Sequence, residues 1–221
     1  MPRMLLHALQ RALAVVALLL AVAPPSFAQD PLTLLQRHPL ESPERGVIAN
    51  RDAIVRALGL KPGMTVADIG AGTGAFMEPM ARAVGPTGRY FGVDIDKDYV
   101  KLMESRAKRL GLSQAQVVLS RTDSVTLPAE SVDLMVVIDA YHHFSPVEPM
   151  LASMKAALRP GGRLIIVDFD RTPKSPRWIK EHVRADKATF LQEIGKAGFR
   201  LDGDITVPGL EGHFVTGFVR P

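Results

Sequence analysis

The stretch Asp68–Gly74 (DIGAGTG) decides the fold, because it closes a short apolar run, Thr65–Ile69 (TVADI). Glycines here let the backbone turn tightly and approach a ligand closely, and a following helix would present its free N–H groups to that ligand. Gly70, Gly72 and Ala75 match the G-x-G-x-x-A variant of the nucleotide-binding fingerprint. The alternative is a turn that serves tight packing alone.

Outward from this turn, apolar runs alternate with helical patterns. Continuous apolar strands separated by helices predict a parallel sheet covered on both faces, and we expect the last two runs to form an antiparallel pair. The fold class is therefore α/β, a doubly wound, mostly parallel seven-stranded sheet with a C-terminal antiparallel strand pair. The expected strands are Thr65–Ile69, Arg89–Val93, Gln116–Leu119, Val132–Ile138, Arg163–Phe169, Phe199–Thr206 and His213–Arg220. The expected helices are 45–58, the segment after Gly74 through Ala83, Tyr99–Leu110, Pro146–Leu158 and Asp186–Ala197.

Acidic residues follow the second and third expected strands, where ligands bind in such sheets. Asp94 ends the second strand, and a carboxylate there can accept hydrogen bonds from both ribose hydroxyls of an adenosine ligand. Asp96 is the competing candidate, but we assign it to the cap of the next helix. Asp123, after Arg121 and Thr122, can accept a hydrogen bond from an adenine amino group, or it is a solvated loop acid.

Together these residues resemble the class I S-adenosylmethionine-dependent methyltransferase family over roughly Ala53 to Phe169. Val66–Gly74 (VADIGAGTG) resembles the family's first motif, Gly92–Asp96 (GVDID) its second-strand acid motif, and Leu158–Gly162 (LRPGG) its Pro-Gly-Gly turn. The resemblance implies a Rossmann-like fold and S-adenosyl-L-methionine as the cofactor.

The same resemblance implies a role for each part of the donor site. Asp68 and the glycine loop would line the methionine end, Asp94 the ribose, and Thr122 with Asp123 the adenine; Asp139 would face the ammonium group. The implied cofactor-binding residues are Asp68, Gly70, Ala71, Gly72, Gly74, Asp94, Ile95, Thr122, Asp123 and Asp139.

The segment Asp139–Phe144 (DAYHHF) follows the fourth strand, where the acceptor should meet the methyl donor. It is similar to the small-molecule or quinone type of methyltransferase. His143 is the candidate general base, since histidine titrates near neutral pH, although a structural role is the alternative. Tyr141 and His142 are candidates for substrate contact. We expect no metal site, because the two histidines are adjacent and nearby acids are assigned to the donor.

The segment Arg171–Arg184 (RTPKSPRWIKEHVR) is basic and contains the only tryptophan, Trp178. In the family such insertions often cover the acceptor, which favours a lid for an anionic or aromatic molecule. A solvated basic loop is the alternative, and the same choice applies to Glu44, Arg45 and Arg51.

Residues 1–28 have the pattern of a secretory signal peptide. Arg3 and Arg11 precede the uncharged run Ala12–Ala23, which is short for a membrane span, and Ser26-Phe27-Ala28 suits cleavage before Gln29. We therefore expect a signal peptide at 1–28, an N-terminal arm at 29–45 and the catalytic domain at 46–221. This predicts a periplasmic or secreted protein without a stable membrane span after cleavage, with an uncleaved anchor as the alternative.

Composition excludes several classes. The chain has 221 residues and no cysteine, so it forms no disulfide and no thiolate site, which argues against the thiol-using arsenic-methylating branch of the family. Without residues 1–28 it keeps 25 basic and 23 acidic residues, a net charge of +2 that gives no reason to expect nucleic acid as a partner. The oligomeric state is not predicted.

The favoured function is transfer of a methyl group from S-adenosylmethionine to an unidentified small-molecule acceptor. One alternative is an exported, non-catalytic nucleotide- or S-adenosylmethionine-binding protein, because the donor is made in the cytoplasm. Another is a nicotinamide-dependent oxidoreductase. Asp68 directly before the glycine loop, the Pro-Gly-Gly turn and the lack of a Tyr-x-x-x-Lys pattern argue against the latter.

Overall fold

The computed structural model of the protein describes residues 38–221. The expected signal peptide and the first part of the expected arm lie outside these residues. Within the described part of the chain, no helix combines the length and the apolar character needed to cross a membrane.

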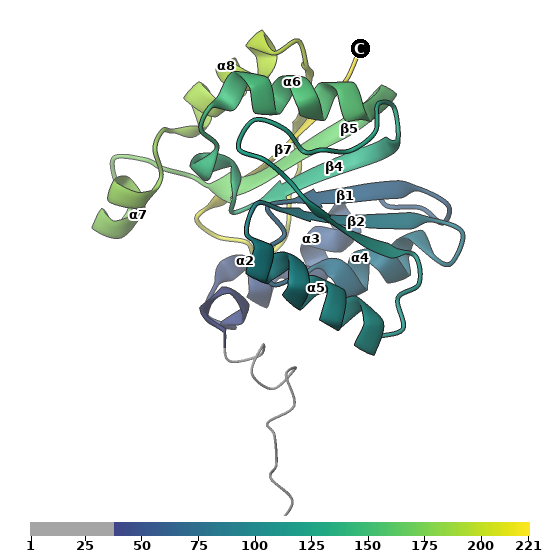
Figure 1. The fold of residues 1–221 in the computed structure, drawn as a ribbon. Coiled ribbons are helices and arrows are strands. Elements are labelled where there is room, and N and C mark those ends of the chain that lie inside the picture. The colour runs from purple at the N-terminus through teal and green to yellow at the C-terminus, as the bar shows by residue number, and fades with distance from the viewer. Residues whose placement is uncertain (1–37) are drawn as a thin grey trace, which may run out of the picture. The chain divides into compact units, whose positions relative to one another are not determined.

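One mixed sheet organises the domain, with the strand order β3-β2-β1-β4-β5-β7-β6 (Figure 1). The first five strands in this order pair in parallel, and β7 is antiparallel to both β5 and β6. This confirms the predicted fold class. The strands are β1 (Thr65–Ile69), β2 (Arg89–Asp94), β3 (Ala115–Leu119), β4 (Val132–Ile138), β5 (Leu158–Phe169), β6 (Arg200–Asp204) and β7 (His213–Val219).

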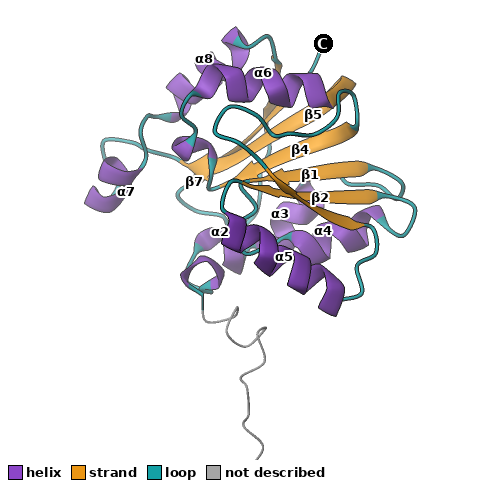
Figure 2. Cartoon of the chain, in the orientation of Figure 1, coloured by secondary structure: helices purple, strands orange, loops and turns teal. Residues whose placement is uncertain are grey.

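Helices cover both faces of this sheet (Figure 2). On one face α3, α4 and α5 pack against alternate strand residues such as Val66 and Leu134, and on the other α6 and α8 pack against residues such as Ala67 and Met135. The alternation follows from the two-residue period of a strand, which sends neighbouring side chains to opposite faces. The helices are η1 (Pro39–Glu41), α2 (Gly46–Ala49), α3 (Arg51–Ala57), α4 (Met77–Val84), α5 (Lys97–Arg109), η2 (Tyr141–His143), α6 (Val147–Ala157), α7 (Arg177–His182) and α8 (Lys187–Lys196).

Two helix starts follow the sequence signals closely. Asp96 accepts a hydrogen bond from the backbone N–H of Asp98 at 2.7 Å and caps α5. Asp186 accepts one from the N–H of Thr189 at 2.9 Å and caps α8. Each carboxylate satisfies a helix N–H that has no partner within the helix. The assignment of Asp96 to a cap is therefore confirmed.

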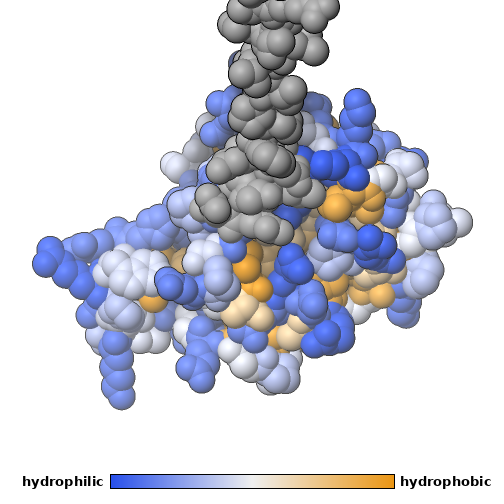
Figure 3. Space-filling model, turned by 90° about the horizontal axis from the view of Figure 1, so that it is seen from below, coloured by the Kyte–Doolittle hydropathy of each residue, from blue (hydrophilic) through white to orange (hydrophobic). Residues whose placement is uncertain are grey.

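Polar side chains that do not face the core lie on the surface of the described residues. Figure 3, the view from below, shows a mostly hydrophilic face interrupted by separate hydrophobic patches. Helix α5 illustrates the division, because Met103 and Ala107 are buried while Lys101 and Glu104 are exposed.

Two elements differ from the sequence expectation. Strand β5 begins at Leu158 rather than Arg163, because Leu158 pairs with Val132 before an irregularity in the register, and the Pro-Gly-Gly turn lies within it. Helix α7 lies inside the segment expected to be a basic lid or loop. Ile179 of α7 and the following Val183 are buried in the core and anchor the helix. The sequence around them is rich in proline and charge and has no apolar periodicity that would predict this burial.

Candidate active site

A cavity of about 520 Å³ lies at the carboxyl ends of β1, β2 and β4. Strand order reverses between β1 and β4, which is where open α/β sheets bind their ligands. The volume is within the range of small-molecule and cofactor sites. Of the residues predicted for the site, the cavity is lined by Asp68, Gly70, Ala71, Gly72, Asp94, Ile95, Thr122, Asp139 and His143.

The glycine loop is held against β2 and cannot carry larger residues. The N–H groups of Gly70 and Ala71 both donate to the carbonyl oxygen of Val93, at 2.8 and 3.1 Å. Gly70 has a φ of 76°, and a Cβ added to it would lie 2.5 Å from the Cβ of Ala140. A side chain at this position would therefore collide with the start of the loop after β4.

Gly74 serves packing rather than the cavity wall. Its φ is also 76°, and an added Cβ would lie 2.9 Å from Cγ of Met103. Gly74 thus lets α5 approach the glycine loop closely, and it is not among the residues that line the cavity.

Asp68 is a fully buried carboxyl group that faces the cavity. Burial raises its pKa from the ordinary 3.8 to about 7, although the hydroxyl of Tyr90, which donates to Oδ2 at 3.2 Å, opposes the rise. The negative charge of Asp94 adds to it. A cationic ligand in the cavity would favour the carboxylate and offset its desolvation.

Asp94 is built into the wall by the glycine loop itself. Its Oδ2 accepts the N–H of Gly72 at 2.7 Å, and its Oδ1 accepts the N–H of Asp96 at 2.9 Å. Each carboxylate oxygen has two lone pairs, so both retain capacity for a ligand hydroxyl. The loop and the acid therefore position each other.

The two residues expected near the adenine lie in different surroundings. Thr122 lines the cavity, whereas Asp123 lies outside it, half exposed, with its Oδ1 3.2 Å from Nε of Arg121. The solvated alternative describes Asp123 in this structure.

Asp139 is buried against two cationic or potentially cationic side chains. Its Oδ2 accepts a hydrogen bond from Nη2 of Arg45 at 2.8 Å. Nε2 of His213 lies 3.1 Å from Oδ1, close enough for an ion pair when the imidazole is protonated. Burial lowers the pKa of His213, but the attraction of Asp139 outweighs it and the net direction is upward. A donor ammonium group would have to share Asp139 with these partners.

Of the three side chains predicted for catalysis or substrate contact, one lines the cavity. His143 does so, and its pKa is lowered by burial and by the neighbouring His142 and His182. The hydroxyl of Tyr141 instead donates to Oε2 of Glu193 at 3.0 Å. His142 is buried with its Nδ1 2.7 Å from Oδ1 of Asp168.

The described end of the expected arm forms part of the cavity wall. Arg45 donates to the carbonyl oxygen of Leu40, and Leu40 lines the cavity. The Glu41 carboxylate makes a buried two-pronged ion pair with Arg106, which also donates to the carbonyl oxygen of Thr73 at 3.0 Å. The described end of the arm is therefore packed against the domain, and its η1 turn is helical.

Several residues of the site were missed by sequence reasoning. Tyr99 lines the cavity from α5. The sequence pattern placed it in an amphipathic helix but gave no sign that it faces a ligand site. Glu41, Arg106 and His182 are joined to the site by contacts between distant segments, which no local pattern signals. His182 lies beside His142 and His143, and the three rings could together hold a metal ion.

Comparisons with known proteins agree with this geometry. A family model described as "Methyltransferase domain" matches residues 60–200. The ubiquinone/menaquinone biosynthesis C-methyltransferase UbiE of Cupriavidus taiwanensis is 28% identical over 116 residues, 52% of this chain and 47% of that protein. The UbiE of Ectopseudomonas mendocina is 31% identical over 123 residues, 55% of this chain and 48% of that protein. The chain spans about half the length of these curated relatives.

A solved structure shares the fold over almost its whole length. The SAM-dependent methyltransferase from Aquifex aeolicus aligns with a TM-score of 0.74 and 24% identity, covering 87% of this chain and 99% of that one. The family match favours a methyltransferase over the nicotinamide-dependent alternative. The chain belongs to the Methyltransferase domain family and has the Rossmann-like fold of the class I S-adenosylmethionine-dependent methyltransferases, as its motifs predicted.

Proposed function

We propose that this protein transfers the methyl group of S-adenosylmethionine to a small, largely apolar acceptor. The observation that carries the proposal is the pairing of Asp68 and Asp94 in one cavity, both built into the wall by β1, β2 and the glycine loop. A buried acid with a raised pKa suits a cationic ligand, and an acid that retains free lone pairs suits a pair of hydroxyls.

The residues present fit the donor group by group. Asp68 and the loop from Gly70 to Gly72 would hold the charged methionine end, and Asp94 the ribose. Ile95 and Thr122 would contact the adenine, since both line the cavity that Asp94 also lines. When bound, the donor supplies an electrophilic methyl group on a sulfonium.

The chain's own contribution is to position the acceptor and to exclude water. Holding two reactants in line is worth up to about 7–11 kcal/mol in favourable systems. The wall on the side of η2 and α6 contains Phe144 and Met150, and α2 contributes Val47 and Ile48. This apolar wall favours an aromatic or aliphatic acceptor, in keeping with the quinone-pathway names of the curated relatives.

We infer from residues 1–28 that the protein is exported and acts as a periplasmic or secreted enzyme. Cell fractionation together with the intact mass of the purified product tests this. A mature chain that begins at Gln29 supports export. A chain found in the cytoplasm with residues 1–28 still attached contradicts it.

The test of function is calorimetric titration of the folded protein with S-adenosylmethionine and with S-adenosylhomocysteine. Asp94→Asn keeps the shape of the side chain but removes its charge and replaces one of the two oxygens that accept the Gly72 and Asp96 N–H groups, so we expect at least tenfold weaker binding, about 1.4 kcal/mol. Asp98→Asn is the matched control, because Asp98 lies nearby in the first turn of α5 with an exposed side chain.

Two outcomes separate the hypotheses. Absence of binding to both ligands by a chain shown to be folded would overturn the methyltransferase proposal. Tight binding without methyl transfer to any member of a panel of phenols, quinols and aliphatic alcohols would favour the non-catalytic alternative.

A further inference from the structure

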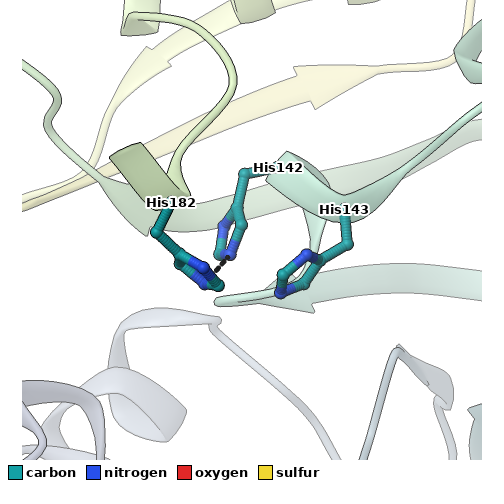
Figure 4. Close-up of side chains that lie close together, drawn as sticks. All are labelled: His142, His143 and His182. Atoms are coloured by element: carbon teal, nitrogen blue, oxygen red, sulfur yellow. Dashed lines mark hydrogen bonds between the residues drawn. The ribbon is translucent and has the colours of Figure 1, made fainter. Parts of the chain in front are cut away.

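Three imidazole rings meet where the turn after β4 faces the end of α7. His142 and His143 belong to η2, and His182 is the last residue of α7 (Figure 4). One ligand nitrogen from each ring can be chosen so that all three lie within 4.8 Å of one another. Figure 4 shows the rings of His142 and His182 joined by a hydrogen bond, with the ring of His143 beside them.

The buried ring is held in the orientation that a metal ligand requires. Asp168 is fully buried, and its Oδ1 lies 2.7 Å from Nδ1 of His142. Because a carboxylate only accepts hydrogen bonds, Nδ1 carries the proton and Nε2 keeps its lone pair toward the cluster. Asp168 is itself fixed by the N–H groups of His142 and Phe169. Metal-bound histidines almost always have such a carboxylate or carbonyl behind them.

The spacing of the two facing nitrogens also suits a metal ion. Nε2 of His142 and Nε2 of His182 are 3.1 Å apart. Zinc–nitrogen bonds of 2.0–2.1 Å place neighbouring ligands of a tetrahedral site about 3.3 Å apart. The side chain of His143 is the one that has to move inward. The residue is exposed, and within the described residues its ring makes no hydrogen bond.

We propose that His142, His143 and His182 form a binding site for a divalent transition metal ion of the zinc class, with Asp168 orienting His142. Three protein ligands leave one coordination position open, the arrangement of catalytic rather than structural zinc sites. His143 also lines the donor cavity, so the site adjoins the cavity wall formed by η2. An acceptor hydroxyl is a ligand that this open position can take.

The test is metal titration of the full-length protein after removal of bound ions with a chelator. Zinc affinity is measured by competition with a chromophoric chelator, and Co²⁺ is added as a spectroscopic probe of ligand number. We expect one ion per chain. His182→Ala removes one ligand from an exposed position and should weaken zinc binding by about 100-fold or more. Loss of a residue that only orients a ligand, such as Asp168, typically weakens metal binding by about 10–100-fold. Asp168→Asn should weaken it within that smaller range.

The matched control is His38→Ala, a histidine near η1 that is not part of the cluster. It should leave zinc affinity and the Co²⁺ spectrum unchanged, while circular dichroism and urea denaturation report that each variant is folded. If the wild type and His182→Ala bind zinc alike, or if His38→Ala weakens binding as much, the proposal is overturned and the contact of His142 with His182 is a hydrogen bond alone. The titration uses no methyl donor, so its outcome is independent of the methyltransferase proposal.

Discussion

Tyr90 on β2 donates its hydroxyl hydrogen to Oδ2 of Asp68 on the neighbouring strand β1, at 3.2 Å. Both side chains are completely buried, and this contact lowers the pKa of Asp68 against the larger effect of desolvation. The negative charge of Asp94 raises the pKa of Asp68 further. The net value of about 7 places the acid that faces the cavity in the middle of the physiological range.

The affinity for S-adenosylmethionine should therefore depend on pH. Because the pKa of Asp68 in the free protein is about 7, the group is mainly protonated below that pH, and binding of a cationic donor has to release the proton. We expect affinity to rise up to tenfold per pH unit toward 7 and then to level off. Calorimetry in two buffers of different ionisation enthalpy, kept below the 7.7–8.0 range of α-amino groups, measures the proton released.

Tyr90→Phe is the variant that tests this assignment. It removes the hydrogen bond that stabilises the Asp68 carboxylate, so the midpoint should move to higher pH by about one to two units, the equivalent of roughly 1.5–3 kcal/mol for a hydrogen bond to a charged group. A midpoint that does not move would assign the pH dependence to another group.

Asp68 should also limit the stability of the protein. Its pKa is higher in the folded protein than the ordinary 3.8, so the stability it contributes is complete at low pH and is lost as pH rises toward 7. Asp68→Asn removes the buried charge and can still accept from Tyr90. We expect the free energy of unfolding at pH 8 to rise by about 2–4 kcal/mol while donor binding is lost.

Urea denaturation of both proteins across pH measures that difference. The gain should disappear at about pH 4, near the ordinary pKa of the carboxyl group, where both side chains are neutral in either state. A variant that is equally or less stable than the parent at pH 8 would show that the Asp68 carboxylate is already compensated in the free protein.

The parts of this site that sequence predicted are those encoded within a few residues. Asp68, Gly70 and Gly72 belong to one strand and its turn, and Asp94 ends the next strand, so their common edge follows from parallel pairing alone. The closing antiparallel pair β6–β7 follows from the same alternating patterns.

The rest depends on where separate segments dock. His182 reaches His142 across 40 positions because Ile179 and Val183 anchor α7, and Glu41 reaches Arg106 across 65. Asp123 shows the reverse case, since its place after β3 suggested a cavity residue but its side chain lies beside Arg121. Side-chain direction in a loop is set by local contacts that motif spacing does not contain.

Gly70→Ala should disrupt the donor site and destabilise the fold. The added Cβ meets Ala140 at 2.5 Å, and the φ of 76° is unfavourable for any residue with a Cβ. Left-handed strain and overpacking together amount to roughly 2–4 kcal/mol. Gly111→Ala isolates the first of these effects, because its φ is 63° and nothing lies within 4 Å of an added Cβ.

Urea denaturation and donor titration should therefore separate the two glycine variants. Gly111→Ala should lose about 1–2 kcal/mol with donor affinity unchanged, whereas Gly70→Ala should lose more and bind the donor at least tenfold more weakly. Equal losses of stability with normal donor binding in both would mean that the loop after β4 gives way to the added methyl group.

Glu41→Gln should weaken both the fold and the cavity wall. The variant leaves Arg106 buried without its countercharge, and breaking a buried pair costs about 3–5 kcal/mol. Because Arg106 keeps its hydrogen bond to the carbonyl oxygen of Thr73, we expect the lower end of that range. Loosening of η1 should also weaken donor binding several-fold, since Leu40 and Thr73 both line the cavity.

Glu181→Gln is the matched control, because it breaks the exposed pair between Arg177 and Glu181 on α7. Surface pairs contribute about 0–1 kcal/mol, so this change should leave both urea denaturation and donor titration nearly unaltered. If Glu41→Gln behaves like Glu181→Gln in both measurements, then the segment before α2 contributes neither to stability nor to the donor cavity. If stability falls and donor affinity does not, the Glu41–Arg106 pair anchors the segment without shaping the cavity.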